Sequence, residues 1–74
     1  MADEKTLQTV GAGETAFVLA VDAGVKARTR LESLGIIPGA EVRVFNNGQG
    51  PLLVSVGEGR VMVERGIAAK VLVA

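Results

Sequence analysis

Three short runs of alternating apolar residues fill the second half of this 74-residue chain, and glycine-containing loops separate them. The runs cover residues 41–45, 52–56 and 60–64. Apolar residues at every second position are typical of strands with one covered face, and short loops favour antiparallel neighbours. The pattern predicts a meander whose inward side chains are Val42, Val44, Leu52, Val54, Val56, Val61 and Val63.

Further strands are expected on either side of this meander. Residues 15–21 are apolar on both faces, so we expect both faces to be covered. Residues 7–10 suit a short first strand, and residues 65–70 a single helical turn before a last strand at 71–73. A small sheet exposes its edges unless it closes. We therefore predict one mostly β, partly open barrel over residues 6–74, behind a frayed tail at residues 1–5.

One helix is well marked, over residues 25–34. Ala27, Leu31 and Leu34 fall on a single helical face. Gly35 stands where a left-handed residue ends a helix, and Pro38 and Gly39 suit the two central positions of a type II turn. We expect Gly35 and Gly39 to hold positive φ angles for structural reasons.

The composition excludes several classes of function. The chain has no Cys and no His, which removes disulfides, thiolate chemistry and imidazole-based sites. Its formal net charge is zero, whereas nucleic-acid modules normally carry a basic excess. The N-terminus lacks a signal peptide's apolar core, and no apolar run approaches the roughly 20 residues of a membrane span. We expect a cytoplasmic protein that neither inserts into membranes nor binds nucleic acid.

The local motifs have mostly structural interpretations. Gly11 and Gly13 precede a strand rather than a helix, which favours a turn over a phosphate-binding loop. The 8 acidic residues are scattered, so we expect no cofactor, no tight metal site and no acid–base pair. Lys26, Arg28 and Arg30 form the main basic cluster, either a solvated helix face or a rim facing an acidic partner.

The most specific segment is residues 30–39, RLESLGIIPG. An alternating strand follows, then Gly50-Pro51, an apolar strand and a final turn whose Ala68 or Ala69 precedes Lys70 and Val71. In this order the segments resemble the FeoA family, small proteins of bacterial ferrous iron transport, over about residues 6–73. Many relatives carry an apolar Pro-Leu-Gly where residues 46–51 here are rich in Asn and Gln.

The resemblance implies an SH3-like barrel with an inserted helix and no catalytic residues. It also implies a partner, the membrane GTPase and transporter FeoB, whose soluble domains are cytoplasmic. Two other functions stay open: a regulatory domain like those attached to metal-dependent repressors, and a KOW-like nucleic-acid module. An enzyme is the weakest interpretation.

A docking surface follows from the alternation of the strands. If the valines point inward, Leu53 and Met62 point outward from adjacent strands. Ile36 and Ile37 cannot both be easily buried in a short link, and Leu31 borders the same region. We expect these residues to form an apolar patch with Arg28 and Arg30 as its charged rim. Structural roles are expected for Gly35, Pro38, Gly39, Gly50 and Pro51.

Overall fold

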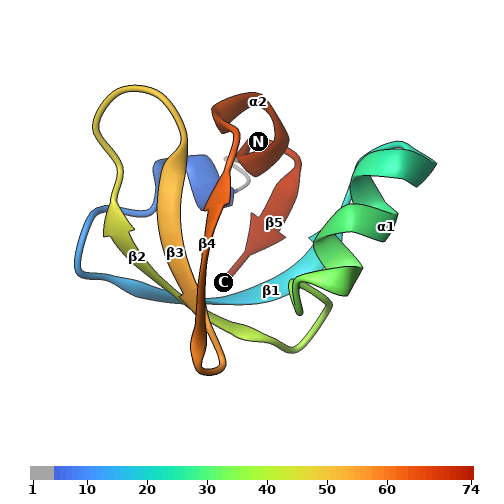
Figure 1. Ribbon diagram of the computed structural model, residues 1–74, viewed down its shortest axis with the longest axis horizontal. Coiled ribbons are helices and arrows are strands. Elements are labelled where there is room, and N and C mark those ends of the chain that lie inside the picture. The colour runs from blue at the N-terminus through green and yellow to red at the C-terminus, as the bar shows by residue number, and fades with distance from the viewer. Residues whose placement is uncertain (1–4) are drawn as a thin grey trace.

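The computed structural model describes residues 5–74 and contains eight short elements (Figure 1). In chain order they are the 3₁₀ helix η1 (Leu7–Thr9), β1 (Thr15–Val21), α1 (Val25–Ser33), β2 (Glu41–Asn46), β3 (Leu52–Val56), β4 (Gly59–Val63), α2 (Arg65–Ala68) and β5 (Val71–Val73). The predicted helix, the meander, the last helical turn and the last strand are all present, with bounds shifted by at most two residues at the ends.

The strands form one antiparallel sheet in the order β4-β3-β2-β1-β5. The sheet curves, so that β4 and β5 lie on opposite sides of the interior while α1 projects to one side (Figure 1). The edge strands β4 and β5 do not pair with each other, which leaves the barrel partly open. This arrangement confirms the predicted mostly β class with one inserted helix.

The core is built almost entirely from small and β-branched side chains. Of the seven residues predicted to point inward, Val42, Val44, Leu52, Val54 and Val63 are buried, and Val56 and Val61 are partly buried against them. β-branched side chains suit a pleated surface and pack closely in a narrow barrel. The other buried members are Leu7, Val10, Ala16, Val18, Leu31, Ile36, Ala68, Val71 and Val73.

The prediction for β1 is wrong on one face. Phe17 and Leu19 are 52% and 57% exposed, while Ala16 and Val18 between them are buried. β1 lies between β2 and β5, so one of its faces meets the core. Within residues 5–74 no helix covers its other face, since Phe17 and Leu19 stay exposed there. Two large apolar side chains therefore lie on the surface of the barrel.

The first segment is a 3₁₀ helix rather than the predicted strand. Val10 N–H donates to the Leu7 carbonyl over 3.2 Å, and Thr9 N–H to the Thr6 carbonyl over 3.0 Å. Leu7 and Val10, three residues apart, are both buried. Side chains at i and i+3 share one face of a 3₁₀ helix, whereas a strand would send them to opposite faces.

The tail prediction is also partly wrong. Residues 1–4 lie outside the described part of the chain, but Lys5 is held against the sheet. Its carbonyl accepts a 2.9 Å hydrogen bond from Val73 N–H, and Thr6 forms a bridge with Leu72. The segment before η1 therefore covers the outer edge of β5.

The end of α1 has the predicted glycine cap. Gly35, at φ 91°, donates to the Glu32 carbonyl, and Ile36 N–H donates to the Leu31 carbonyl over 2.9 Å. These two bonds define a Schellman motif. Ala40 N–H then donates to the Ile37 carbonyl over 2.9 Å, with Gly39 at φ 92°, which confirms the type II turn.

Candidate protein-binding surface

Three exposed or half-buried apolar side chains gather on the outer face of the meander. Leu53 of β3 is the direct register partner of Met62 of β4, and Met62 is 56% exposed. Phe45 of β2 is also exposed, beside a register shift between Val44 and Asn46. We call Phe45, Leu53 and Met62 the β-face cluster. A bulge of this kind redirects a side chain, and here it accompanies an aromatic ring left on the surface.

Two arginines flank the aromatic member of this cluster. The Arg60 guanidinium carbon lies 4.5 Å from the centroid of the Phe45 ring, and that of Arg43 lies 5.8 Å away. Arg60 is on β4 and Phe45 on β2, so their contact spans β3 and joins the three strands into one surface. Cation–π contacts at exposed sites contribute about 0.5–1 kcal/mol. They leave the edges of each guanidinium free to bind carboxylates.

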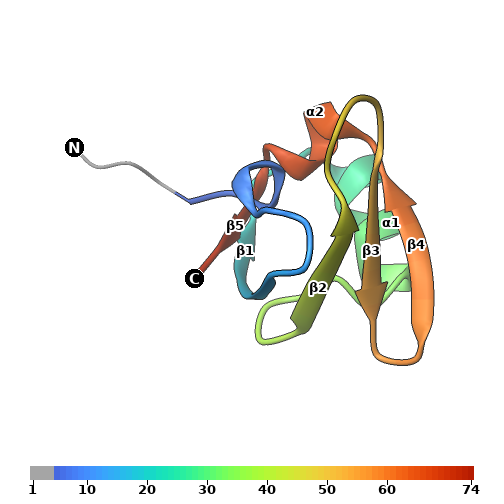
Figure 2. The same cartoon turned by 90° about the vertical axis from the view of Figure 1, so that its left-hand side faces the viewer.

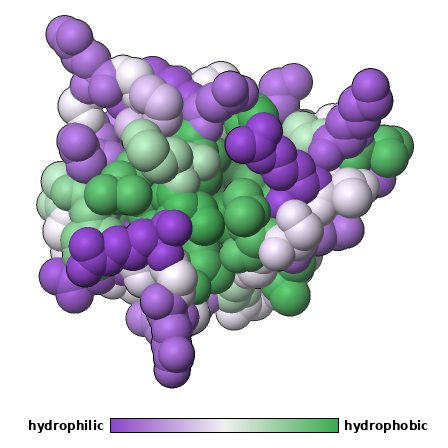
Figure 3. All heavy atoms as spheres, in the orientation of Figure 1, coloured by the Kyte–Doolittle hydropathy of each residue, from purple (hydrophilic) through white to green (hydrophobic). Residues whose placement is uncertain are grey.

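A shallow groove lies on the other side of Met62, between β4 and α1. It is lined by Ala27, Arg30, Leu31, Leu34, Met62, Val63, Glu64 and Ile67. Figure 3 shows apolar side chains across the centre of this face of the molecule, with charged side chains around them. The structure therefore brings together three residues predicted for the docking patch, namely Arg30, Leu31 and Met62.

Two of the predicted patch residues are not on the surface. Leu31 is 3% exposed and forms the floor of the groove, and Ile36 is fully buried. The Schellman bond between them turns both side chains into the core. The expectation that Ile36 and Ile37 cannot both be buried is confirmed, since Ile37 is 44% exposed.

The remaining predicted residues lie in different places. Ile37 lies in the link between α1 and β2, which runs beside β1, where Gly39 N–H donates to the Val18 carbonyl over 2.7 Å. β1 is two strands away from β3, so Ile37 is separated from the pair of Leu53 and Met62. Arg28 is exposed on α1 and does not line the groove. The structure therefore places Leu53 and Met62 side by side on β3 and β4, but it does not extend the predicted patch to Ile37.

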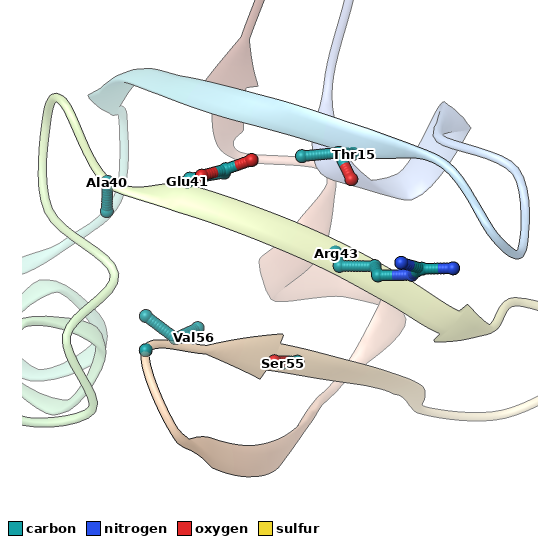
Figure 4. Close-up of a pocket in the computed structure, with 7 residues that line it drawn as sticks. Thr15, Ala40, Glu41, Arg43, Ser55 and Val56 are labelled. Atoms are coloured by element: carbon teal, nitrogen blue, oxygen red, sulfur yellow. The ribbon is translucent and has the colours of Figure 1, made fainter.

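A polar hollow lies next to the β-face cluster, toward the end of the sheet where β2 begins and β3 ends. Its lining comes from β1, β2, β3 and the adjoining turns, as Figure 4 shows, and consists of Thr15, Ala40, Glu41, Arg43, Ser55, Val56 and Gly57. Glu41 is its one carboxylate. Among residues 5–74 no group of three or more His, Cys, Asp or Glu side chains converges on a metal-sized site. The hollow offers hydrogen-bonding groups rather than an acid–base pair.

The loop of residues 46–51 is fixed to the barrel by side chains. The Asn47 side-chain amide donates to the carbonyls of Gln8 and Val10 over 2.8 and 2.7 Å. Arg65 donates from Nη2 to the Gly48 carbonyl over 2.6 Å and from Nε to the Gly50 carbonyl over 3.2 Å. Gly50, at φ 76°, turns the chain into Pro51 and β3. The polar residues of this loop therefore hold it in place.

The sequence interpretation missed Phe45, Arg43 and Arg60 as surface residues that act together. Phe45 follows Arg43 by two positions, so alternation alone assigns both to the charged face. Both Phe residues of the chain, Phe17 and Phe45, are exposed, which is unusual in a domain so poor in aromatics. An aromatic residue in phase with charged residues was the available signal.

The comparisons with known proteins agree with this architecture. The FeoA domain model matches residues 5–74. The chain belongs to the FeoA family. This FeoA is 38% identical, over 82% of its length, to the Fe(2+) transport protein A of Methanocaldococcus jannaschii, of which it covers 74%.

Solved structures show the same fold. A FeoA crystal structure described as an iron uptake regulatory protein has TM-score 0.89, with 33% identity and 96% of each chain covered. The Stenotrophomonas maltophilia FeoA, solved with zinc and described as a prokaryotic SH3 domain protein, has TM-score 0.82 and 32% identity, covering 95% of this chain and 89% of that one. The chain therefore belongs to a ferrous iron transport family and has an SH3-like fold.

The same fold occurs as part of a larger regulator. A manganese-dependent transcriptional repressor matches with TM-score 0.88 at 21% identity, covering 100% of this chain and 42% of that one. This likeness concerns the fold alone. Within residues 5–74 no helix has the length and apolar character needed to cross a membrane.

Proposed function

We propose that this FeoA is a non-catalytic interaction module of ferrous iron transport that docks, in the cytoplasm, on the soluble part of the FeoB GTPase-transporter. Membership of the FeoA family supports the transport role. The observation that carries the docking is the β-face cluster with its flanking arginines. Large side chains exposed together on three adjacent strands mark an interaction site more often than scattered ones do.

The chemistry of the surface defines the partner segment that it fits. Phe45, Leu53 and Met62 provide an apolar centre, and Arg43 and Arg60 stand at its border. Interfaces concentrate their energy in a few aromatic, arginine and methionine anchors surrounded by polar groups. The complementary surface on the transporter is an apolar segment bordered by carboxylates, which the arginines would steer and bind.

Catalysis is a weaker interpretation on the same observations. The polar hollow contains Glu41 but no second acid, and the chain has no His or Cys to act as base or nucleophile. General acid–base chemistry needs a donor and an acceptor positioned together. A surface of anchors and hydrogen-bonding groups instead suits binding to a protein.

The repressor-domain interpretation has one observation in its favour, the shared fold. A likeness at 21% identity does not assign a role to any residue of this chain, and the chain covers only 42% of the repressor. The KOW-like interpretation lacks the basic excess that nucleic-acid modules normally carry, because the chain's formal net charge is zero. Both remain weaker than docking on the transporter.

The proposal is tested by measuring binding directly. The purified cytoplasmic part of FeoB would be titrated with this FeoA by calorimetry, with and without a guanine nucleotide. We expect saturable binding in at least one nucleotide state, and reduced affinity for Phe45→Ala. Saturable binding that Phe45→Ala leaves unchanged would move the docking site elsewhere, and absence of binding in every state would contradict the proposal.

A further inference from the structure

The two edges of the sheet are protected differently. Along β5, Val73 N–H donates to the Lys5 carbonyl over 2.9 Å, and Thr6 bridges Leu72. Along β4, nothing comparable occurs within residues 5–74: neither Arg60 nor Met62 makes a backbone hydrogen bond outside the strand ladder. Figure 2 shows β4 at one side of the molecule with no further strand beyond it, and α1 lies behind it, across the groove at residues 62–64. An uncovered edge is a template for pairing with another strand.

β4 also lacks three of the usual devices that prevent such pairing, namely a bulge, a proline and a lysine. Its five register pairs with β3 run without a shift, whereas β1–β5 and β2–β3 are both interrupted. The strand contains no Pro and no Lys. Edge strands are normally blunted by bulges, prolines or lysines. The β4 edge is therefore regular and able to pair.

The hydrogen-bonding phase shows which groups face outward. A two-residue turn, Gly57 and Glu58, joins Val56 to Gly59, so these flanking residues form a hydrogen-bonded pair. Hydrogen-bonded and non-bonded pairs alternate along an antiparallel ladder. Arg60 and Met62 thus belong to non-bonded pairs, and their N–H and C=O groups point away from β3.

The side chains along this edge are arranged symmetrically about Met62. The sequence there is Arg60-Val61-Met62-Val63-Glu64, with opposite charges two residues to either side of the methionine. Arg60, Met62 and Glu64 are all exposed, and alternation sends them to the same face. Glu64 has no capping bond from its side chain to α2, so its carboxylate is available.

We propose that β4 pairs antiparallel with β4 of a second copy of this chain, centred on Met62, to make one continuous sheet. The backbone N–H of each Met62 then donates to the carbonyl of the other Met62. Arg60 stands directly opposite Glu64 of the other copy, and this contact occurs twice by symmetry. The Glu64 carbonyl already accepts hydrogen bonds from the N–H groups of Ile67 and Ala68. Only the Glu64 N–H is therefore left to bond the other copy, where it would donate to the Arg60 carbonyl.

The expected complex is transient. A pair of short strands buries less than the roughly 800 Å² per partner of a standard stable interface. Cross-strand pairs of opposite charge are favourable, and like charges in the same positions are not. We therefore expect self-association in the upper micromolar range, detectable by sedimentation equilibrium at concentrations up to about 1 mM. This pairing uses the edge of the sheet and docking uses its face, but Arg60 and Met62 contribute to both. Leu53, on β3, belongs to the docking face alone.

Charge reversal tests the register without relying on loss of folding. Arg60→Glu places like charges opposite each other in a homodimer, and so does Glu64→Arg. Each variant alone should self-associate about tenfold more weakly than the parent. Mixed together, the two restore both opposite-charge contacts and should form a heterodimer at least as strong as the parent dimer. Circular dichroism would confirm that both variants remain folded.

A matched pair controls for net charge alone. Arg28→Glu and Glu32→Arg change exposed residues of α1 by the same charges, and their mixture should associate no better than the parent. A parent that stays monomeric at about 1 mM would overturn the proposal. So would a heterodimer that forms equally well from the α1 pair.

Discussion

The backbone N–H of Ile36 donates to the carbonyl of Leu31 over 2.9 Å, and the side chains of both residues are buried. This bond ends α1 and turns the chain toward the core. It explains why two residues that the sequence placed on a docking surface belong to the core. Gly35 lies between the end of α1 and Ile36. The packing of both Leu31 and Ile36 therefore depends on this glycine.

Replacing the capping glycine should therefore destabilise the barrel. Gly35 and Gly39 hold φ 91° and 92°, a region unfavourable to alanine by about 1 kcal/mol. A Cβ at Gly35 would also lie 3.2 Å from Val56 Cγ1, whereas one at Gly39 meets nothing within 4 Å. Urea unfolding should show the larger loss for Gly35→Ala, about 1–2 kcal/mol.

Gly66 provides the control for these two positions. It lies within α2 with no left-handed φ, and a Cβ there would meet nothing within 4 Å. Gly66→Ala should leave stability unchanged or raise it by about 0.5–1 kcal/mol. Equal unfolding midpoints for Gly35→Ala and Gly66→Ala would remove the capping argument.

Asn47 should prove structural despite its place in a surface loop. Its amide nitrogen bonds the carbonyls of Gln8 and Val10, which tie η1 to the loop. Asn47→Ala leaves both acceptors unpaired and should cost about 1–3 kcal/mol. Asn47→Asp should cost more at neutral pH, because a carboxylate oxygen would face two carbonyls. If Asn47→Asp unfolds later than Asn47→Ala in urea, the assigned amide orientation is wrong.

Ferrous ion should not bind tightly to the isolated protein. The chain has no His or Cys, and its carboxylates do not converge within the described residues. Anaerobic calorimetry with ferrous ion should show no stoichiometric site of submicromolar affinity. Such a site, if found and abolished by one carboxylate-to-amide change, would mean that separate acidic residues come together only around the metal.

Duplex DNA and RNA should likewise bind weakly at physiological salt. The formal net charge is zero, and phosphate neutralisation supplies most non-specific affinity. Fluorescence anisotropy should show no micromolar complex with either duplex. A complex whose affinity falls steeply with salt, and which Arg43→Ala with Arg60→Ala removes, would instead favour the KOW-like interpretation.

The sequence predicted the strands because valine at alternating positions is an unambiguous signal, as at Val42 and Val44. Residues 7–10 offered no such signal, since apolar residues three apart in a short segment fit either a strand or a 3₁₀ turn. The contact between Arg60 and Phe45 depends on the β2 bulge and on a reach across β3, which spacing along the chain does not encode. The candidate surface was therefore only half predicted, through Leu53 and Met62.

The central claim, docking through the β-face cluster, is tested most directly by comparing two double variants. Leu53→Asp with Met62→Asp charges the cluster, and Phe17→Asp with Leu19→Asp charges exposed apolar residues of β1. Leu53→Asp alone separates docking from edge pairing, because Leu53 lies on β3 and not at the edge. Melting curves would confirm that every variant is folded.

The decisive measurement is the affinity of each variant for the cytoplasmic part of FeoB. The account predicts a loss of about a hundredfold or more for Leu53→Asp with Met62→Asp, as expected for interface anchors. It predicts a change of less than about threefold for the β1 variant. Undiminished binding by the folded β3–β4 variant, with loss of binding by the β1 variant, would contradict the account and place the docking surface at Phe17 and Leu19.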